Sequence, residues 1–315
     1  MDRARSIVAP VDFTPCSLAA VRQAVRIAKW NQARLDVLHV VAEDVVTELE
    51  GVLSPHQQDI RSGLVEDARR EWQRLTASDD ALRGLPLSVE VGHPVGSVLQ
   101  RLNDSGADLL VMGVHGASHP GGGAGTVATA CVRKAHGMVL LVREEQAAPF
   151  KSIVACIDFS PTSLRALNQA VRIALQDGAA LHVLHVFEGP WHRTHYRAPT
   201  PLATPDQQKQ YIDGLRGRLE SFCKPLATEM GYLNPQFHVL DHRGYGDGIT
   251  EFVRHYNVEL AVLGTKGKTN LRYMLWGRTA ERVVRNSPCS ILVVRPEDTP
   301  APQETAAARP MKPAV

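Results

Sequence analysis

The stretch that decides the fold is Ser6-Ile-Val-Ala-Pro-Val-Asp-Phe-Thr-Pro15, which returns later in the chain as Ser152-Ile-Val-Ala-Cys-Ile-Asp-Phe-Ser-Pro161. The match extends beyond these ten positions: residues 6–41 and 152–187 are identical at 22 of 36 positions. A repeat of this length indicates two copies of one structural unit.

The ends of the two copies also match. Asp108-Leu-Leu-Val-Met-Gly113 corresponds to Glu259-Leu-Ala-Val-Leu-Gly264, and Leu140–Arg143 corresponds to Leu292–Arg295. Each copy is therefore long enough to be a domain of its own. We expect a first domain over 1–146, a second over 147–297, and a disordered tail over 298–315, which is rich in Pro and Ala and poor in large apolar side chains.

Each copy alternates short apolar runs with longer helical patterns. Ile7–Val11 and Leu109–Met112 are nearly continuous apolar runs, as expected for strands that are covered on both faces. Thr14-Pro15 and Ser160-Pro161 each supply a capping hydroxyl followed by proline, which begins a helix. Longer polar helices are predicted over 54–78 and 205–231. The pattern predicts an α/β fold of two tandem, doubly wound, five-stranded parallel sheets with helices on both faces.

Composition excludes several classes of function. The formal net charge is +2, so the chain lacks the overall basic field that holds nucleic acid. No apolar run is long enough to cross a bilayer, and we expect a cytoplasmic protein with neither nucleic-acid nor membrane partners. The five cysteines are scattered without a C-x-x-C pair, which favours buried, reduced thiols.

The residues that carry chemistry follow the fourth strand of each copy. The second copy has Gly264-Thr-Lys-Gly267, nine further residues, and then Gly277. The first has Gly113-Val-His-Gly116, eight residues, and Gly125-Thr126. Glycine lets a phosphate approach main-chain amides closely, and a glycine that opens a helix exposes the unpaired amides of its first turn. In an open parallel sheet such a crevice lies where the strand order reverses.

With these motifs, the chain resembles the universal stress protein family, in which nucleotide-binding members carry G-x2-G-x9-G-[ST] after the fourth strand and an Asp after the first. The resemblance covers about residues 4–144 and 151–296 and implies an adenine nucleotide alpha hydrolase-like fold. It also implies that adenine lies between the end of the first strand and the backbone after the second, with the phosphates on the glycine motif. In the first copy, the implied residues are Pro10, Val11, Asp12, Val40, Met112, Gly113, His115, Gly116, Gly125, Thr126 and Val127. In the second, they are Cys156, Ile157, Asp158, Val186, Leu263, Gly264, Lys266, Gly267, Gly277, Arg278 and Thr279.

Both copies depart from that motif. The first is one residue short before Gly125, and the second has Arg278 where the family has Ser or Thr. Because Arg278 and nearby lysines can oppose phosphate charge, we favour the second copy as the nucleotide site.

Other interpretations of these residues are open. Asp12 and Asp158 can serve as turn residues that bond their own backbone, and the glycines can serve tight turns alone. A P-loop is rejected because Val262 stands where its first glycine is required. His182 and His185 are three apart on a predicted strand, so they point to opposite faces and cannot chelate one metal together. His39 and His185 occupy equivalent positions and are expected to be half-buried with satisfied ring nitrogens.

We expect a stress-response protein that binds ATP, with or without Mg²⁺, or a related adenine nucleotide, and that acts as a regulator with at most slow ATPase activity. The alternative is a stress-protective scaffold, or a binder of a lipid fragment or a metal. The resemblance further implies pairing through an edge strand, here near Val139–Val142 and Ile291–Val294. Two tandem copies can satisfy that pairing internally, and a homodimer is the other arrangement.

Overall fold

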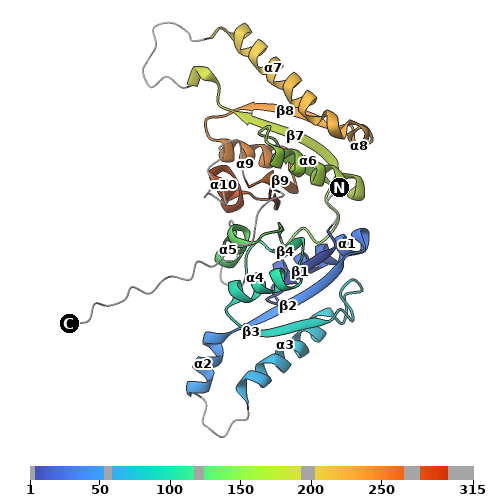
Figure 1. Ribbon diagram of the computed structural model, residues 1–315, viewed down its shortest axis with the longest axis vertical. Coiled ribbons are helices and arrows are strands. Elements are labelled where there is room, and N and C mark those ends of the chain that lie inside the picture. The colour runs from blue at the N-terminus through green and yellow to red at the C-terminus, as the bar shows by residue number, and fades with distance from the viewer. Residues whose placement is uncertain (1–3, 53–58, 117–123, 193–202, 266–276, 297–315) are drawn as a thin grey trace, which may run out of the picture.

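A computed structural model describes residues 4–52, 59–116, 124–192, 203–265 and 277–296. The two halves of the chain form one continuous ten-stranded sheet in the order β3-β2-β1-β4-β5-β10-β9-β6-β7-β8. The first half lies at the lower end of the elongated molecule and the second half at the upper end (Figure 1).

The first half contains five strands and five helices among the described residues. They are β1 (Ser6–Pro10), α1 (Pro15–Asn31), β2 (Arg34–Ala42), α2 (Glu43–Val52), α3 (Ile60–Thr76), β3 (Leu87–Gly92), α4 (Pro94–Asp104), β4 (Leu109–Gly113), α5 (Thr126–Lys134) and β5 (Met138–Val142).

The second half repeats this order. Its elements are β6 (Ser152–Cys156), α6 (Pro161–Asp177), β7 (Ala180–Phe187), the 3₁₀ turn η1 (Pro190–His192), α7 (Pro205–Cys223), η2 (Lys224–Leu226), α8 (Ala227–Gly231), β8 (Gln236–Asp241), α9 (Tyr245–His255), β9 (Leu260–Gly264), α10 (Arg278–Asn286) and β10 (Ser290–Val294).

Each face of the sheet is covered by its own hydrophobic core. Successive residues of β1 alternate between the two cores: Ile7 and Ala9 belong to the one under α1, α3, α6 and α7, and Val8 to the one under α4, α5, α9 and α10. Strands that are buried on both faces need the continuous apolar runs seen in the sequence. The predicted doubly wound α/β architecture is confirmed.

The predicted helix starts are also confirmed. The side chains of Thr14 and Ser160 accept hydrogen bonds from the amides of Ser17 and Ser163, and proline follows each cap.

Two helical predictions differ from the structure. Residues 43–52 form α2, which the sequence pattern did not reveal. The helix expected over 205–231 is divided into α7, η2 and α8, and Pro225 lies at the break, where it has no amide to continue the hydrogen-bond ladder.

The two halves meet along an antiparallel pair of strands. Ile291 pairs with Leu141, Leu292 with Leu140, and Val293 with Val139, while the other strand pairs of the sheet are parallel. The internal pairing expected from the edge-strand segments is therefore present. It joins the two five-stranded sheets of the prediction into one.

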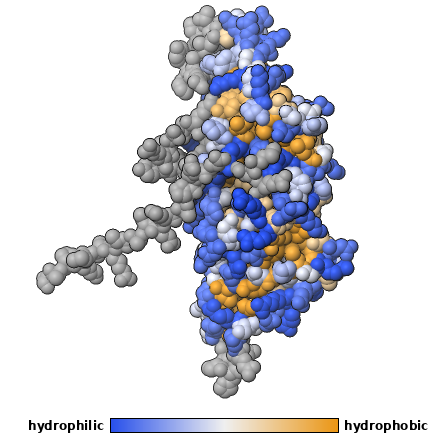
Figure 2. Space-filling model, turned by 45° about the vertical axis from the view of Figure 1, so that its right-hand side comes forward, coloured by the Kyte–Doolittle hydropathy of each residue, from blue (hydrophilic) through white to orange (hydrophobic). Residues whose placement is uncertain are grey.

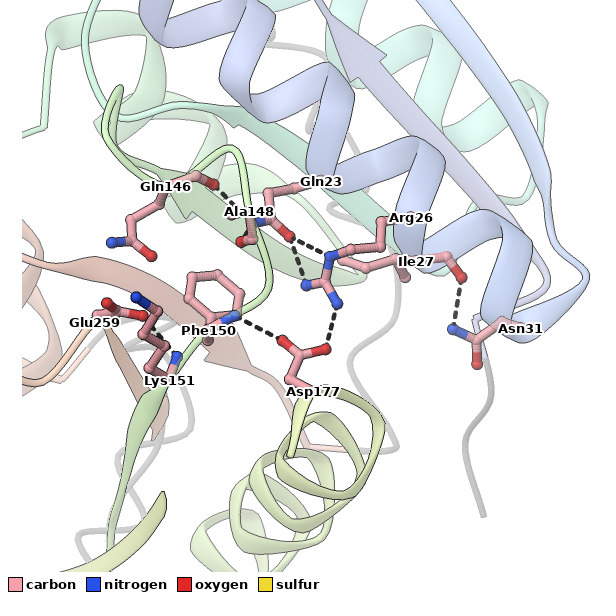
Figure 3. Close-up of polar contacts among 10 residues, drawn as sticks. All are labelled: Gln23, Arg26, Ile27, Asn31, Gln146, Ala148, Phe150, Lys151, Asp177 and Glu259. Atoms are coloured by element: carbon pink, nitrogen blue, oxygen red, sulfur yellow. Dashed lines mark hydrogen bonds and ion pairs between the residues drawn. The ribbon is translucent and has the colours of Figure 1, made fainter. Parts of the chain in front are cut away.

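Polar contacts on the α1 and α6 side connect the halves further (Figure 3). Fully buried Gln23 donates to the carbonyls of Gln146 and Ala148, both at 2.6 Å, and so holds the connecting segment. Arg26 of α1 forms an ion pair with Asp177 of α6, whose other oxygen accepts from the amide of Phe150 at 2.8 Å. The connecting segment is also anchored in the core, because Phe150 is 1% exposed.

The contacts on this side follow an approximate two-fold symmetry. The residues equivalent to Arg26 and Asp177 are Arg172 and Asn31, and Arg172 donates to Asn31 Oδ1 at 2.9 Å. Ala4 stands where the second half has Phe150, and it lines a small cavity of about 30 Å³ between the halves. The two sides of the joint therefore differ: one has an ion pair and a packed phenylalanine, and the other has an arginine bonded to a neutral asparagine and a cavity.

Among the described residues, no helix is long and apolar enough to span a membrane. On the face shown in Figure 2, hydrophobic side chains form separate patches between hydrophilic ones.

Candidate functional site at the strand ends

The loops that carry the glycine motif lie where the order of the strands reverses. In the first half β1 pairs with β2 on one side and with β4 on the other, and in the second half β6 lies between β7 and β9. The loops after β1 and β4 therefore leave neighbouring strands at the same edge of the sheet. This is the position at which open α/β sheets bind ligands.

The first glycine of each motif has a packing role. A Cβ atom on Gly113 would lie 3.1 Å from both Cys16 Sγ and the Ser17 amide, and one on Gly264 would lie 2.8 Å from Thr162 Cγ2. These contacts are the first turns of α1 and α6, which pack closely against β4 and β9. The simpler interpretation, a tight structural approach, accounts for both glycines.

The last glycine of each motif begins a helix. Gly125 is the N-cap of α5 and Gly277 the N-cap of α10, and neither cap has a side-chain hydrogen bond to the helix. By contrast, side chains cap α1, α6 and α7. The caps themselves are fixed, because Gly125 donates to the carbonyl of Val114 at 2.8 Å and Gly277 to that of Thr265 at 2.9 Å. The first-turn amides beyond them have no partner within their own helix, which is the arrangement that favours an anion.

The aspartates after β1 and β6 are both turn residues. Asp12 Oδ1 accepts from the amide of Thr14 at 3.2 Å and from its hydroxyl at 2.6 Å, and Asp158 Oδ1 accepts from the amide of Ser160 at 3.0 Å. The next residues, Phe13 and Phe159, have φ values of 64° and 62°. The strand-to-helix turn therefore uses these carboxylates, as the simpler interpretation predicts.

Asp12 also reaches the glycine motif of its own half. A Cβ atom on Gly116 would lie 2.5 Å from Asp12 Oδ2. The loops after β1 and β4 are thus in contact, and a carboxylate lies beside the second glycine. That negative charge would repel a phosphate group at Gly116.

The side chains at the ends of the central strands belong to the core. Val11, Met112, Cys156, Ile157 and Leu263 are all buried, so only their backbone can face a ligand. Pro10, at the end of β1, is partly buried.

Val40 and Val186, at the ends of β2 and β7, pack with the core under α4 and α9. His39 and His185 beside them hydrogen-bond the carbonyls of Val11 and Ile157 through Nδ1, each at 2.8 Å. The expectation of half-buried, satisfied histidines is confirmed, and burial lowers the pKa of His39.

The helix-start residues are the more accessible part of the site. Thr126, Val127 and Arg278 are exposed, and His115 and Thr279 are partly exposed. Lys266 and Gly267 lie outside the described residues.

The sequence did not single out Thr265. Its hydroxyl is buried and has no hydrogen-bond partner among the described residues, and its carbonyl accepts from Gly277. The first half has Val114 at the equivalent position, so comparing the two copies could have found it. Among the residues that the structure describes, this buried hydroxyl has no partner, and it adds beside the helix start a polar group that Val114 does not supply in the first half.

Buried His182 and partly buried His238 form a pair that the sequence did not reveal. His182 Nδ1 lies 3.1 Å from His238 Nε2, and both rings contact Phe252 and Tyr256. His185 lies on the other face against Phe159, so the expectation that His182 and His185 point to opposite faces is confirmed. The described residues contain no cluster of three or more metal-ligating side chains.

This histidine pair predicts a loss of stability in mild acid. Burial, together with the charges of His182 and Arg216, lowers the pKa of His238 to about 4, and burial lowers that of His182. Between that value and the usual pKa near 6.5, the unfolded chain binds more protons than the folded one, so the free energy of unfolding falls as pH decreases from 7 to 5. We expect His238→Gln to reduce this pH dependence, measured by urea unfolding at both pH values. His255→Gln, an exposed change on α9, is the control; an equal pH dependence in wild type and His238→Gln would contradict the assignment.

All five cysteines are buried and free. Burial raises the pKa of Cys131 and Cys223 to about 12, and that of Cys289 to about 11. Their thiols therefore stay protonated at neutral pH and are poor nucleophiles.

Comparison with known proteins agrees with this geometry. The universal stress protein family matches the chain twice, over residues 3–143 and 149–295. The chain belongs to the universal stress protein family. Its relatives include a universal stress protein of Mycobacterium tuberculosis strain H37Rv, which is 25% identical over 307 residues and covers 92% of this chain and 96% of the relative. A shorter universal stress protein of Methanocaldococcus jannaschii is 30% identical over 148 residues, covering 46% of this chain and 82% of the relative.

Solved structures of similar fold span both halves of this universal stress protein. One from Archaeoglobus fulgidus has a TM-score of 0.60 at 16% identity and covers 92% of this chain and 98% of its own. A functionally unknown protein of Pseudomonas aeruginosa PAO1 has a TM-score of 0.62 at 20% identity, with 94% of each chain covered. The predicted family, with its tandem arrangement, is thus confirmed.

Proposed function

We propose that this universal stress protein binds ATP or a related adenine nucleotide at the strand ends, with the second half as the stronger site. The observation that carries the proposal is the uncapped glycine start of α5 and α10, present in both halves at the point where the strand order reverses. A helix start of this kind favours the charge of a phosphate group.

The residues at these helix starts fit a phosphate. A Cβ atom on Gly277 would lie 3.2 Å from the carbonyl oxygen of Thr265, so a larger residue would fill the space beside the first-turn amides. Arg278, the first residue of α10, is exposed and adds a cation at the position where the family has Ser or Thr. A guanidinium group can donate two hydrogen bonds to one phosphate.

The difference between the halves supports the preference for the second site. In the first half the Asp12 carboxylate lies beside Gly116, where its negative charge would repel a phosphate. The second half offers Arg278 and the hydroxyl of Thr265, which has no partner within the described part of the chain. The negative charge of a phosphate is therefore better neutralised in the second half.

The role that we propose is regulatory, in the cytoplasm, with at most slow hydrolysis. The carboxylates of Asp12 and Asp158 are both engaged in the turns that begin α1 and α6. Fast hydrolysis needs a general base directed at the attacking water, and the family resemblance implies that both residues lie near the adenine rather than the terminal phosphate.

The first experiment is to identify what the purified protein carries. Denaturation followed by mass spectrometry of the released small molecules should yield adenine nucleotide, and protein stripped of ligand should bind added ATP in a calorimetric titration. No nucleotide in the extract, together with no heat on titration, would favour the alternative of a scaffold or of a binder of another ligand.

A further inference from the structure

The two helices that begin at the candidate anion sites are each held, at their other end, by an arginine from the opposite half. Arg295 follows β10 of the second half, and its Nη2 donates to the carbonyls of Val132 and Arg133 at 2.6 and 3.0 Å. These carbonyls belong to the last turn of α5 in the first half. They would otherwise lack an intrahelical partner.

The reciprocal contact comes from the first half. Arg143 follows β5, and its Nη1 donates to the carbonyl of Ser287, the C-cap of α10, at 3.5 Å. The amide of Arg143 also donates to Ser290 Oγ at 3.1 Å. The two contacts cross because β5 and β10 are antiparallel. The end of β10 therefore lies beside α5, the helix that precedes β5, and the end of β5 lies beside α10, the helix that precedes β10.

A third contact links the start of one helix to the other helix directly. Ala124, which immediately precedes the cap of α5, donates its amide to the carbonyl of Val284 in α10 at 3.3 Å. Figure 1 shows α5 and α10 next to one another where the halves meet. The residue before the first anion site is therefore bonded to the helix that forms the second.

These contacts link the free energy of anion binding at the start of α5 to that at the start of α10. An anion at the N-terminus and a cation at the C-terminus both stabilise the dipole of a helix, and here each cation is fixed to the sheet of the opposite half. Arg295 is 4% exposed, so its position depends on how the two halves pack. Fixing α5 at its start also fixes Ala124 against α10, which lowers the cost of ordering α10 when a second ligand binds.

We propose that the two nucleotide sites are positively coupled through these crossed contacts, so that occupancy of one half raises the affinity of the other. This inference rests on the proposed nucleotide binding. The expected coupling is about fivefold or more in affinity, within the ordinary range for two sites in one protein. Reciprocity requires the same factor in both directions.

The test is a set of calorimetric titrations of the full chain with ATP. Gly125→Val should disable the first site and Gly277→Val the second, so each variant reports the affinity of the remaining site. If the sites are coupled, the overall two-site binding constant of the wild type exceeds the product of these two affinities by about fivefold or more. Arg295→Met should bring that ratio toward one. Arg285→Met is the control, because Arg285 is exposed and, among the described residues, forms an ion pair only with Glu281 of its own helix.

The outcomes separate this inference from the proposed function. Two sites whose wild-type binding constant equals the product of the single-site values would overturn the coupling and leave nucleotide binding in place, as would a single site per chain. No binding of ATP to any form would overturn both. If Arg295→Met does not fold, the ratio obtained from the wild type and the two glycine variants still decides whether the sites are coupled.

Discussion

Replacing Arg26 by methionine is expected to cost about 3 kcal/mol of unfolding free energy, because it leaves a buried carboxylate without its cation. The side chain of Asp177 is fully buried, and Arg26 and the amide of Phe150 are the partners that hold its two oxygens. Arg26 also donates to Gln23 Oε1, so the connecting segment loses support as well. For a chain of this size, the corresponding fall in melting temperature is roughly 6–12 °C.

The structure offers a matched control at the equivalent position of the other half. Arg172→Met removes a guanidinium that donates to the neutral Asn31 and lies over the Trp30 ring, but it leaves no buried carboxylate behind, so we expect a smaller loss than for Arg26→Met. In addition, Asp177→Asn should rescue part of the Arg26→Met loss, because asparagine leaves no buried charge. Equal losses in the two arginine variants, or no rescue by Asp177→Asn, would contradict the role assigned to this ion pair. Thermal and urea unfolding measure the stability of the wild type, Arg26→Met, Arg172→Met and Arg26→Met/Asp177→Asn.

The second large effect concerns ligand affinity. We expect Gly277→Val to weaken ATP binding in the second half by at least about 100-fold, or roughly 2.7 kcal/mol. Gly277 has φ −79° and ψ 143°, a conformation that valine adopts readily, so the change does not strain the backbone. Instead, its Cβ lies against the Thr265 carbonyl and its branches occupy the approach to the first-turn amides.

A glycine outside the site provides the control for this variant. Gly217 lies in α7, and a Cβ atom there would meet nothing within 4 Å. Gly217→Ala should therefore leave ATP affinity unchanged and raise helix stability slightly. Unchanged ATP affinity in both Gly277→Val and Gly125→Val would show that the anion does not bind at these helix starts.

The sequence predicted the architecture because its signals are local and repeated. The ten residues that begin at Ser6 return at Ser152, and each copy places a capping hydroxyl and a proline where α1 and α6 begin. The edge-strand segments near Val139 and Ile291 also stood out, because the resemblance implied pairing through them. The repeat and the helix caps depend on neighbouring residues, so one sequence is enough to find them.

The features that the sequence did not reveal depend on how distant segments align. The pairing of His182 with His238 requires the register of β7 against β8, which no local pattern fixes. Arg143 and Arg295 end matching strands in both copies, and only the antiparallel joint shows that each reaches a helix of the opposite half. Gly113 and Gly264 belong to the motif, yet their contacts with α1 and α6 explain them without a ligand.

The most direct test of the account compares ATP with adenosine by calorimetric titration of the wild type and of Gly125→Val/Gly277→Val. We predict that the wild type binds ATP at least about 100-fold more tightly than adenosine, because the helix-start amides contact the phosphates, and that the double variant loses this difference. Equal affinities of the wild type for ATP and adenosine, or a difference that survives in the double variant, would contradict it.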